Sequence, residues 1–259
     1  MPERTSYEPG TPSWVDLSSH KPDESVRFYG ELFGWRAAKP GPDDDKDGYR
    51  MFTLRDKIVA GLGPLPEDGQ PPVWATYIAV ADADETAAKV IEAGGHTLMP
   101  PLDVLDAGRT AVFADTEGAV FCIWQANEHP GAELVNEPGT WCWNELATRE
   151  PEKAKAFYGA VFGWSSKEYD TGGGMPYTEW LVGDATAGGM MEMGDMYPED
   201  VPPHWMVYFA VEDADATTEK AISLGGSAVV EPRDIMPGRF AVLGDHNGSV
   251  FAILQPKGA

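Results

Sequence analysis

The chain has 259 residues, of which 42 are acidic and 19 basic, so its formal net charge at pH 7 is −23. A charge of that sign repels phosphate backbones and anionic membrane surfaces, and we therefore expect neither nucleic acid nor a membrane as a partner. No stretch reaches the ~20 apolar residues that span a bilayer. The N-terminus lacks the apolar stretch of a signal peptide, and only Cys122 and Cys142 are present, so the sequence predicts a cytoplasmic protein.

The first half alternates strand-like and helix-like segments. The stretch SWVDLSS around Trp14 is typical of a short strand, and KPDESVRFYGELF after it carries apolar residues at helical spacing up to a stop at Gly34. Strands are expected next at 49–54, 58–62 and 74–80, then a helix at 84–93, and finally a hairpin at 109–114 and 120–125. The order predicts two strand–helix–strand–strand–strand units.

The same pattern returns in the second half. FYGELFGW at 28–35 reappears as FYGAVFGW at 157–164, PPVWATYIAVADAD as PPHWMVYFAVEDAD, and DTEGAVFCIWQ as DHNGSVFAILQ. A duplicated domain is the simplest cause. We predict domains at 11–127 and 139–255, joined by a polar linker at 128–138. The octapeptide should end the first helix of each half, with its aromatic residues packed on the sheet and a glycine at the helix stop.

These motifs resemble the glyoxalase/bleomycin resistance/dioxygenase superfamily, also called vicinal oxygen chelate proteins. The resemblance covers almost all of both halves and is strongest to the two-domain glyoxalase-like proteins of actinobacteria, often labelled hydroxylases. It implies an α+β fold of tandem domains, each made of two βαβββ modules that form an incomplete eight-stranded barrel with the ligand in its cupped interior. Fold alone does not transfer chemistry, so the site must be argued from its residues.

The resemblance also indicates where a metal would bind. Metal-dependent members use His, Glu or Gln on the first, fourth, fifth and eighth strands of a domain. The fourth-strand segment at 59–62 contains no such residue. The other mapped positions hold Trp14, Ala75 and Cys122 in the first half and Trp143, Met206 and Ala252 in the second. Trp, Ala and Met offer no oxygen or imidazole donor, so we expect no bound metal and no other cofactor.

What remains in each cup is aromatic with one carboxylate. Side chains alternate along a strand, so Asp16 should face the same way as Trp14, and Glu145 the same way as Trp143. A buried carboxylate can act as a general base or bind a ligand, but it can also simply pair with a backbone donor or an arginine. The tryptophans can likewise contact a ligand or fill the cup as core. The candidate catalytic residues are Glu145, Asp16 and His204, and the candidate ligand-binding residues are Trp14, Trp143, Ala75, Tyr77, Met206, Tyr208, Cys122 and Trp124.

Three functions stay open at this point. The favoured one is metal-independent binding of a small aromatic or polycyclic metabolite, for sequestration or for a role in secondary metabolism. The alternative is a lyase, isomerase or hydroxylase-type oxygenase of the same fold that uses Asp16 or Glu145 as base. The third is an interaction protein whose cups have become solid core. We expect a monomer with internal pseudo-symmetry, or a homodimer.

Overall fold

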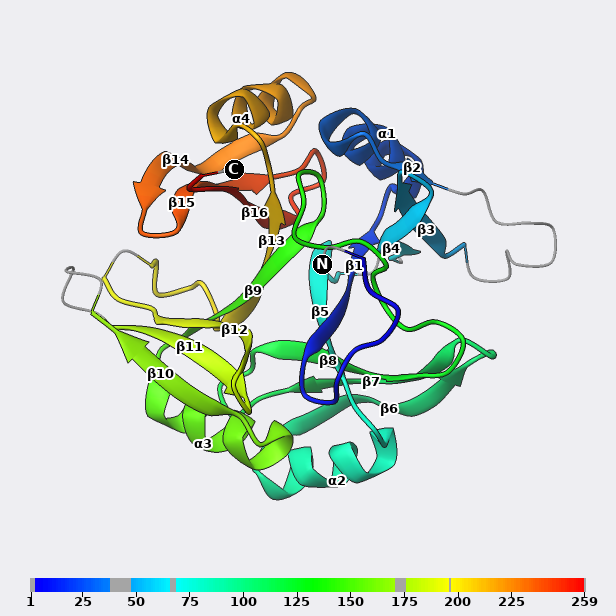
Figure 1. Ribbon diagram of the computed structural model, residues 1–259, viewed down its shortest axis with the longest axis vertical. Helices are drawn as coiled ribbons and strands as arrows, with labels where there is room; N and C mark the ends of the chain where they lie inside the picture. Colours follow the sequence, from blue (N-terminus) through cyan, green and yellow to red (C-terminus); the bar gives the residue numbers. More distant parts are fainter. Residues whose placement is uncertain (1–2, 38–47, 66–68, 171–175, 196, 259) are drawn as a thin grey trace.

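A computed structural model gives the architecture and describes residues 3–37, 48–65, 69–170, 176–195 and 197–258 (Figure 1). Within the described residues, each half contributes eight strands and two helices; the strands at 36–37 and 96–104 of the first half were not among the segments named from the sequence. The first half contains β1 (Pro12–Ser19), α1 (Pro22–Phe33), β2 (Arg36–Ala37), β3 (Arg50–Leu54), β4 (Lys57–Pro64), β5 (Val73–Ala79), α2 (Ala83–Glu92), β6 (His96–Val104), β7 (Gly108–Ala114) and β8 (Val120–Ala126). The second half contains β9 (Trp141–Thr148), α3 (Pro151–Phe162), β10 (Ser165–Tyr169), β11 (Tyr177–Val182), β12 (Ala185–Glu192), β13 (His204–Ala210), α4 (Ala214–Ser223), β14 (Ser227–Ile235), β15 (Gly238–Gly244) and β16 (Val250–Pro256).

Each half forms one eight-stranded sheet that does not close. The strand orders are β2-β3-β4-β1-β5-β8-β7-β6 and β10-β11-β12-β9-β13-β16-β15-β14. The two modules of a half meet at its centre, where β1 pairs antiparallel with β5, and β9 with β13. This is the predicted tandem α+β fold of paired βαβββ modules. We call the face of the first sheet that is turned away from its helices cup 1, and the corresponding face of the second sheet cup 2.

The helices begin and end where the sequence motifs predict. Proline occupies the first turn of α1 and of α3, and each helix stops at a left-handed glycine, Gly34 with φ 77° and Gly163 with φ 70°. The Asp-Ala-Asp motifs start the other two helices, because the Asp82 and Asp213 side chains accept a hydrogen bond from the backbone N–H three residues later. Among the described residues, no helix is long and apolar enough to cross a bilayer.

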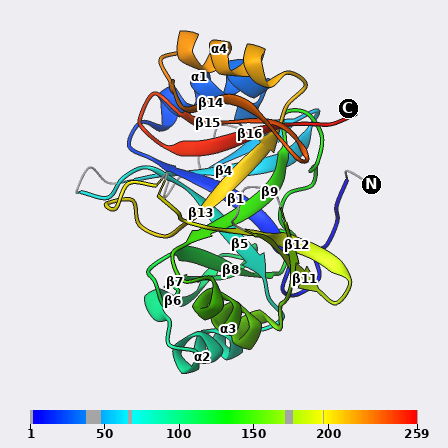
Figure 2. The ribbon, with the colours of Figure 1, turned by 90° about the vertical axis from the view of Figure 1, so that its left-hand side faces the viewer.

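The two halves pack crosswise. Helix α1 lies beside α4, and α2 lies beside α3, so the first module contacts the last and the two middle modules contact each other (Figure 1). Figure 2 shows the central strands β1, β5, β9 and β13 crossing between these two helical layers. One buried cluster joins helix α1 to the last module, and a second joins helix α2 to the third module, which contains α3. The two halves are therefore joined by contacts at both helical layers.

The tyrosine of each octapeptide holds the other half. Tyr29 in α1 donates its hydroxyl to Asp245 Oδ2 at 3.0 Å, and Tyr158 in α3 donates to Asp115 Oδ2 at 3.0 Å. All four residues are buried, and each aspartate sits in the closing hairpin of the opposite half. The octapeptide thus does more than pack its helix on its own sheet: it joins the halves through a buried, charge-assisted hydrogen bond.

The last residue of each octapeptide makes a second crossing contact. Trp35 Nε1 donates to the carbonyl oxygen of Gly139 at 2.6 Å, and Trp164 Nε1 donates to that of Gly10 at 2.7 Å. Gly10 and Gly139 lie just before β1 and β9. Each half therefore fixes the entry to the first strand of the other.

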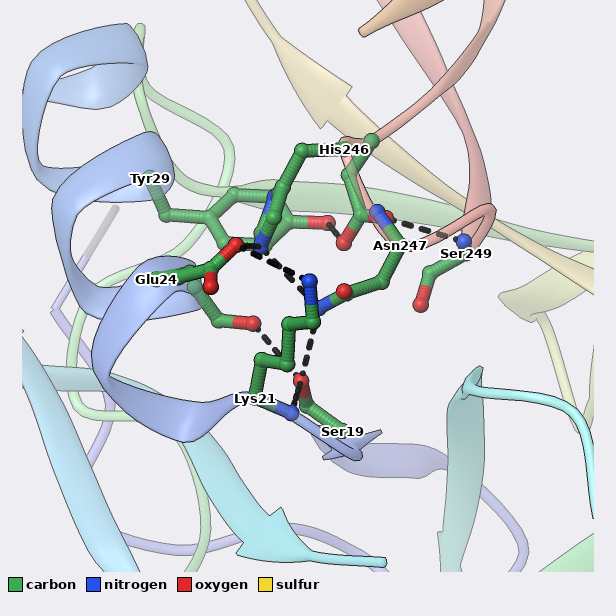
Figure 3. Close-up of polar contacts among 9 residues, drawn as sticks. Ser19, Lys21, Glu24, Tyr29, His246, Asn247 and Ser249 are labelled. Atoms are coloured by element: carbon green, nitrogen blue, oxygen red, sulfur yellow. Dashed lines mark hydrogen bonds and ion pairs between the residues drawn. The ribbon is translucent and has the colours of Figure 1, made fainter. Parts of the chain in front are cut away.

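Figure 3 shows the polar contacts around the Tyr29 crossing. Asn247 Nδ2 donates to Ser19 Oγ at 3.1 Å, the hydroxyls of Ser19 and Ser25 are 2.8 Å apart, and His246 Nε2 lies 3.8 Å from Glu24 Oε2. A serine near a histidine and a glutamate suggests nucleophilic catalysis. However, Ser19 is fully buried and its oxygen also accepts from the backbone N–H of Lys21 at 3.1 Å, so this cluster is a structural joint.

Candidate functional site: two cups with one floor

The floor of cup 1 is a chain of hydrogen bonds that ends on a carboxylate. Trp14 Nε1 donates to Tyr49 Oη at 3.1 Å, and Tyr49 donates in turn to Asp16 Oδ2 at 3.0 Å. Tyr77 donates to the same oxygen at 2.9 Å. Trp14 and Asp16 are on one face of β1 because they are two residues apart, and β5 places Tyr77 directly opposite Trp14. The structure therefore brings the predicted residues Trp14, Asp16 and Tyr77 together.

The floor of cup 2 repeats this arrangement. Trp143 Nε1 donates to Tyr177 Oη at 2.9 Å, and Tyr208 donates to Glu145 Oε1 at 2.7 Å. Tyr177 also hydrogen-bonds to Glu145. Trp143 lies opposite Tyr208 in the β9–β13 pairing, as Trp14 lies opposite Tyr77. The two halves thus hold the same tryptophan–tyrosine–carboxylate–tyrosine unit.

A glycine makes room for the tyrosine in each cup. Gly61 pairs with Asp16, and a Cβ on it would lie 1.9 Å from Tyr49 Oη and 2.8 Å from Asp16 Cβ. Gly189 pairs with Glu145, and a Cβ there would lie 1.8 Å from Tyr177 Oη. No side chain larger than hydrogen fits while the tyrosine keeps its place.

Burial sets the protonation behaviour of both floors. Asp16 is 7% exposed and Glu145 8% exposed. Burial raises the pKa of Asp16 to about 6, although hydrogen bonds from Tyr77 and Tyr49 oppose the rise. Burial raises the pKa of Glu145 as well, against the hydrogen bonds from its tyrosines. The pKa values of these tyrosines are also raised by burial, so they remain neutral donors to the two carboxyl groups.

The segment between β8 and β9 covers cup 1. The ring of His129 meets Trp14 edge-on with 4.6 Å between centroids, and lies 5.8 Å from the ring of Trp124. Trp124 Nε1 donates to the His129 carbonyl at 2.8 Å. Ala132 N then donates to the Ser13 carbonyl at 2.9 Å. With this cover Trp14 is only 3% exposed, so in cup 1 the tryptophan is core.

Cup 2 has no such cover among the described residues. Trp143 is partly exposed and takes part in no ring–ring contact described for the chain. It lies on an apolar surface whose buried members are Tyr208, Phe240 and Ala252. The partly buried side chains packed on that surface are Cys142, Trp143, Met206, Val230, Ile235, Val242 and Leu254. We call this set the cup 2 lining.

The remaining predicted residues lie around these floors. Ala75 is beside Asp16 in the β1–β5 pairing, and Met206 is beside Glu145 in the β9–β13 pairing. Cys122 is buried next to Tyr77 across the parallel β5–β8 pair. His204 lies further along β13, opposite Ala147, and its Nδ1 is 2.9 Å from the Pro202 carbonyl oxygen. It is thus at the rim of cup 2 and forms no hydrogen bond with Glu145 in the described contacts.

Sequence reasoning missed Tyr49, Tyr177 and His129. The two tyrosines hold corresponding places in the duplicated sequence: Tyr49 directly precedes β3, and Tyr177 is the first residue of β11. Each precedes a glycine of the next strand by twelve residues. That repeat was readable in the sequence. The role of His129 was not, because it has no counterpart in the second half and its position depends on how the linker folds back.

The residues of both cups do not fit a divalent metal. Cup 1 presents Trp14, Ala75 and Cys122 where the resemblance places ligands and no ligand residue at 59–62 of the fourth strand, with the single carboxylate of Asp16 beside them. Neutral phenols already donate to that carboxylate, and burial raises the pKa of the Cys122 thiol. Across the residues that the structure describes, no group of three or more His, Cys, Asp or Glu side chains is arranged to hold a metal ion.

Two surface cavities lie outside the cups. One, of about 290 Å³, lies between the start of α3 and β10–β12, and contains the ion-paired Lys155 and Glu168. The other, of about 330 Å³, lies at the joint of the halves beside Phe33 and Gly139. Neither cavity is lined by a tryptophan, tyrosine or carboxylate of the two hydrogen-bonded floors. The tyrosines fill the bottom of each cup.

The comparisons with known proteins agree with this architecture. The chain matches the family "Glyoxalase/Bleomycin resistance protein/Dioxygenase superfamily" twice, at residues 12–123 and 132–253. It is 46% identical over 265 residues to "Putative glyoxylase CFP32" of Mycobacterium bovis, covering 99% of this chain and 98% of that protein. It is 39% identical over 266 residues to "Anthracycline biosynthesis protein DnrV" of Streptomyces peucetius, covering 97% of this chain and 95% of that protein.

Solved structures with this fold are more distant in sequence. The Mn(II)-bound glyoxalase from Novosphingobium aromaticivorans superposes with a TM-score of 0.66 at 15% identity, over 95% of this chain and 82% of that one. The 2,2',3-trihydroxybiphenyl 1,2-dioxygenase from Sphingomonas wittichii gives a TM-score of 0.61 at 12% identity, over 97% and 93%. At these identities the likeness concerns the fold alone. With both halves matched and two open eight-stranded sheets of paired modules, the chain belongs to the glyoxalase/bleomycin resistance protein/dioxygenase superfamily.

Proposed function

We propose that the protein binds a flat aromatic or polycyclic metabolite in cup 2 without a metal ion. The observation that carries the proposal is the partly exposed Trp143 on an otherwise apolar lining, next to the hydrogen-bonded Glu145. Large flat side chains with a few fixed polar groups are the usual surface for a flat organic ligand. The name of the Streptomyces relative, an anthracycline biosynthesis protein, supports a role in secondary metabolism and a polycyclic ligand.

The two halves differ in how well their cups suit a flat ligand. Trp143 of cup 2 is partly exposed, whereas the His129 ring contacts its counterpart Trp14 in cup 1. Glu145 and Tyr208 can hydrogen-bond to a hydroxyl or carbonyl group of the ligand. We therefore assign ligand binding to the second half and a structural role to cup 1.

Calorimetric titration with a neutral hydroxyanthraquinone, with EDTA present, tests this assignment. We expect one site per chain, and Trp143→Ala should weaken it by roughly tenfold through lost stacking area, consistent with ~1–3 kcal/mol for burying such a side chain. Glu145→Gln should weaken binding less, because the amide keeps one acceptor. An aliphatic aldehyde is the control ligand. If Trp143→Ala binds the quinone as tightly as the parent, the ligand site is not in cup 2.

The second candidate is catalysis by a carboxylate base. It is favoured by the raised pKa of Glu145, which burial produces beside the proposed ligand surface. In that case the bound quinone or its hydroquinone would be converted on incubation in air, and Glu145→Gln would abolish conversion while retaining binding. Recovery of unchanged ligand after many hours leaves binding as the function.

A further inference from the structure

The mouth of cup 2 carries an arginine that the site described so far does not use. Arg233 lies on β14 opposite Phe240 of β15, and its guanidinium carbon is 5.0 Å from the centroid of the Phe240 ring. Phe240 is one of the buried members of the cup 2 lining. The guanidinium therefore lies over the cup side of the sheet, stacked on an aromatic face that holds it in place.

This arginine differs from its neighbour on the same hairpin. Arg239 is bound by Asp215 and Asp234, and its counterpart Arg109 is bound by Asp84 and Asp103. No ion pair joins Arg233 to a carboxylate within the described part of the chain, although the protein has 42 acidic and 19 basic residues. Its side chain is exposed at the rim. A cation without a carboxylate partner, in so acidic a protein, is available for an external anion.

Tyr197 is influenced by charges of both the floor and the mouth of cup 2. Burial raises the pKa of Tyr197, Glu145 adds to the rise, and the positive charge of Arg233 opposes it. Its hydroxyl is 3.4 Å from Met191 Sδ, and its ring is 6.4 Å from that of His204. The Tyr197 hydroxyl is thus influenced by the charges of both Glu145 and Arg233.

Cup 1 lacks this feature. The pair that corresponds to Arg233 and Phe240 is Leu102 and Thr110, which offers neither a cation nor an aromatic face. Cup 1, which the segment between β8 and β9 covers, therefore has no counterpart of the Arg233 guanidinium, whereas cup 2 has this charge. We propose, on the basis of the proposed function, that cup 2 selects aromatic ligands carrying an anionic group, a carboxylate or an ionised phenol, which pairs with Arg233 while the rings lie against Trp143 and the lining.

A matched pair of probes tests the proposal: anthraquinone-2-carboxylate and the neutral anthraquinone-2-carboxamide, titrated by calorimetry into the full chain. The parent should bind the carboxylate about tenfold more tightly than the amide, as expected of a charge-assisted hydrogen bond at a partly screened site. Arg233→Gln should remove this preference and leave affinity for the amide unchanged. Added salt should lower the preference in the parent only.

Arg27→Gln is the matched control, because it removes the same charge from an exposed position on α1. If it reduces carboxylate binding as much as Arg233→Gln does, the effect is the overall charge and the inference is wrong. If the amide and the carboxylate bind equally to the parent, the inference is wrong but the proposed function stands. If neither probe binds, both the inference and the proposed function are overturned.

Discussion

The two cups share a floor and differ in their cover. Both contain a tryptophan that donates to a tyrosine beside a buried carboxylate, with a second tyrosine on the same carboxyl group. In cup 1 the chain after the eighth strand turns back and places His129 against Trp14. In cup 2 the same surface stays partly exposed. After duplication the floor was kept in both copies, whereas the surroundings of the indole ring diverged.

The difference separates structure from recognition. The tryptophan–tyrosine–carboxylate–tyrosine unit is present both in the covered cup 1 and in the partly exposed cup 2. In both places it serves the fold, because it gives a buried carboxylate its hydrogen bonds and links neighbouring strands. Within the described residues, cup 2 differs from cup 1 in the partly exposed Trp143 and in the Arg233–Phe240 pair. Function is therefore better sought in what distinguishes the halves than in what they share.

The largest expected effect is on stability at the two tryptophans. Trp14→Ala should lower the free energy of unfolding by about 3–5 kcal/mol, the usual loss for a buried tryptophan, because Trp14 is 3% exposed. Trp143→Ala should lower it by about 1–3 kcal/mol, since part of that ring is already in contact with water. Urea unfolding of both variants measures the difference. Equal losses would mean that the two cups are equally closed.

The next effect is a pH dependence of stability to which Asp16 of cup 1 contributes. Burial raises the pKa of Asp16 from 3.8 to about 6, so in this range the folded protein holds a proton that the unfolded chain has released. The free energy of unfolding must then fall as pH rises from about 4 to about 6, by ~3 kcal/mol at most for this group. Asp16→Asn should make that part of the stability profile less steep, whereas Asp106→Asn on an exposed turn should not. An unchanged slope in Asp16→Asn would contradict the assigned cause.

A smaller effect is expected at the glycines under the tyrosines. A Cβ at Gly61 would meet Tyr49 Oη at 1.9 Å, so Gly61→Ala should force Tyr49 off Asp16 and lower the free energy of unfolding by about 1–3 kcal/mol. Gly189→Ala should act in the same way on Tyr177 and should also weaken quinone binding in cup 2. Combining Gly61→Ala with Tyr49→Ala should give a total loss below the sum of the single losses. Additive losses would show that the two residues are not in conflict.

Most of the fold could be predicted from the sequence, because its signals are local or repeated. The helix stops at Gly34 and Gly163 and the aspartate caps at Asp82 and Asp213 each depend on a few neighbouring residues. Because the sequence is duplicated, each of these helix stops and caps occurs twice. Boundaries moved by a residue or two: the strand expected from residue 49 begins at Arg50.

The candidate site was only partly predictable, for physical reasons. Strand alternation correctly placed Trp14 with Asp16 on one face, because two residues on one strand have a fixed relation. Tyr49 reaches Asp16 across β4, over the gap left by Gly61, and alternation on a single strand carries no information about that contact. The hydrogen bond from Tyr29 to Asp245 depends on how the two domains pack against each other, so no local sequence pattern predicts it.

The smallest expected effect tests whether the cover alone closes cup 1. His129→Ala removes the ring that meets Trp14 but leaves the linker backbone held by the Ala132 and Trp124 hydrogen bonds. The exposed indole should then bind a flat quinone at a second site, several-fold more weakly than cup 2, because cup 1 has Leu102 and Thr110 where cup 2 has Arg233 and Phe240. Calorimetry of His129→Ala in a Trp143→Ala background isolates this site, and Trp14→Phe should weaken it. If the double variant binds no quinone while remaining folded by circular dichroism, the cups differ in shape as well as in cover.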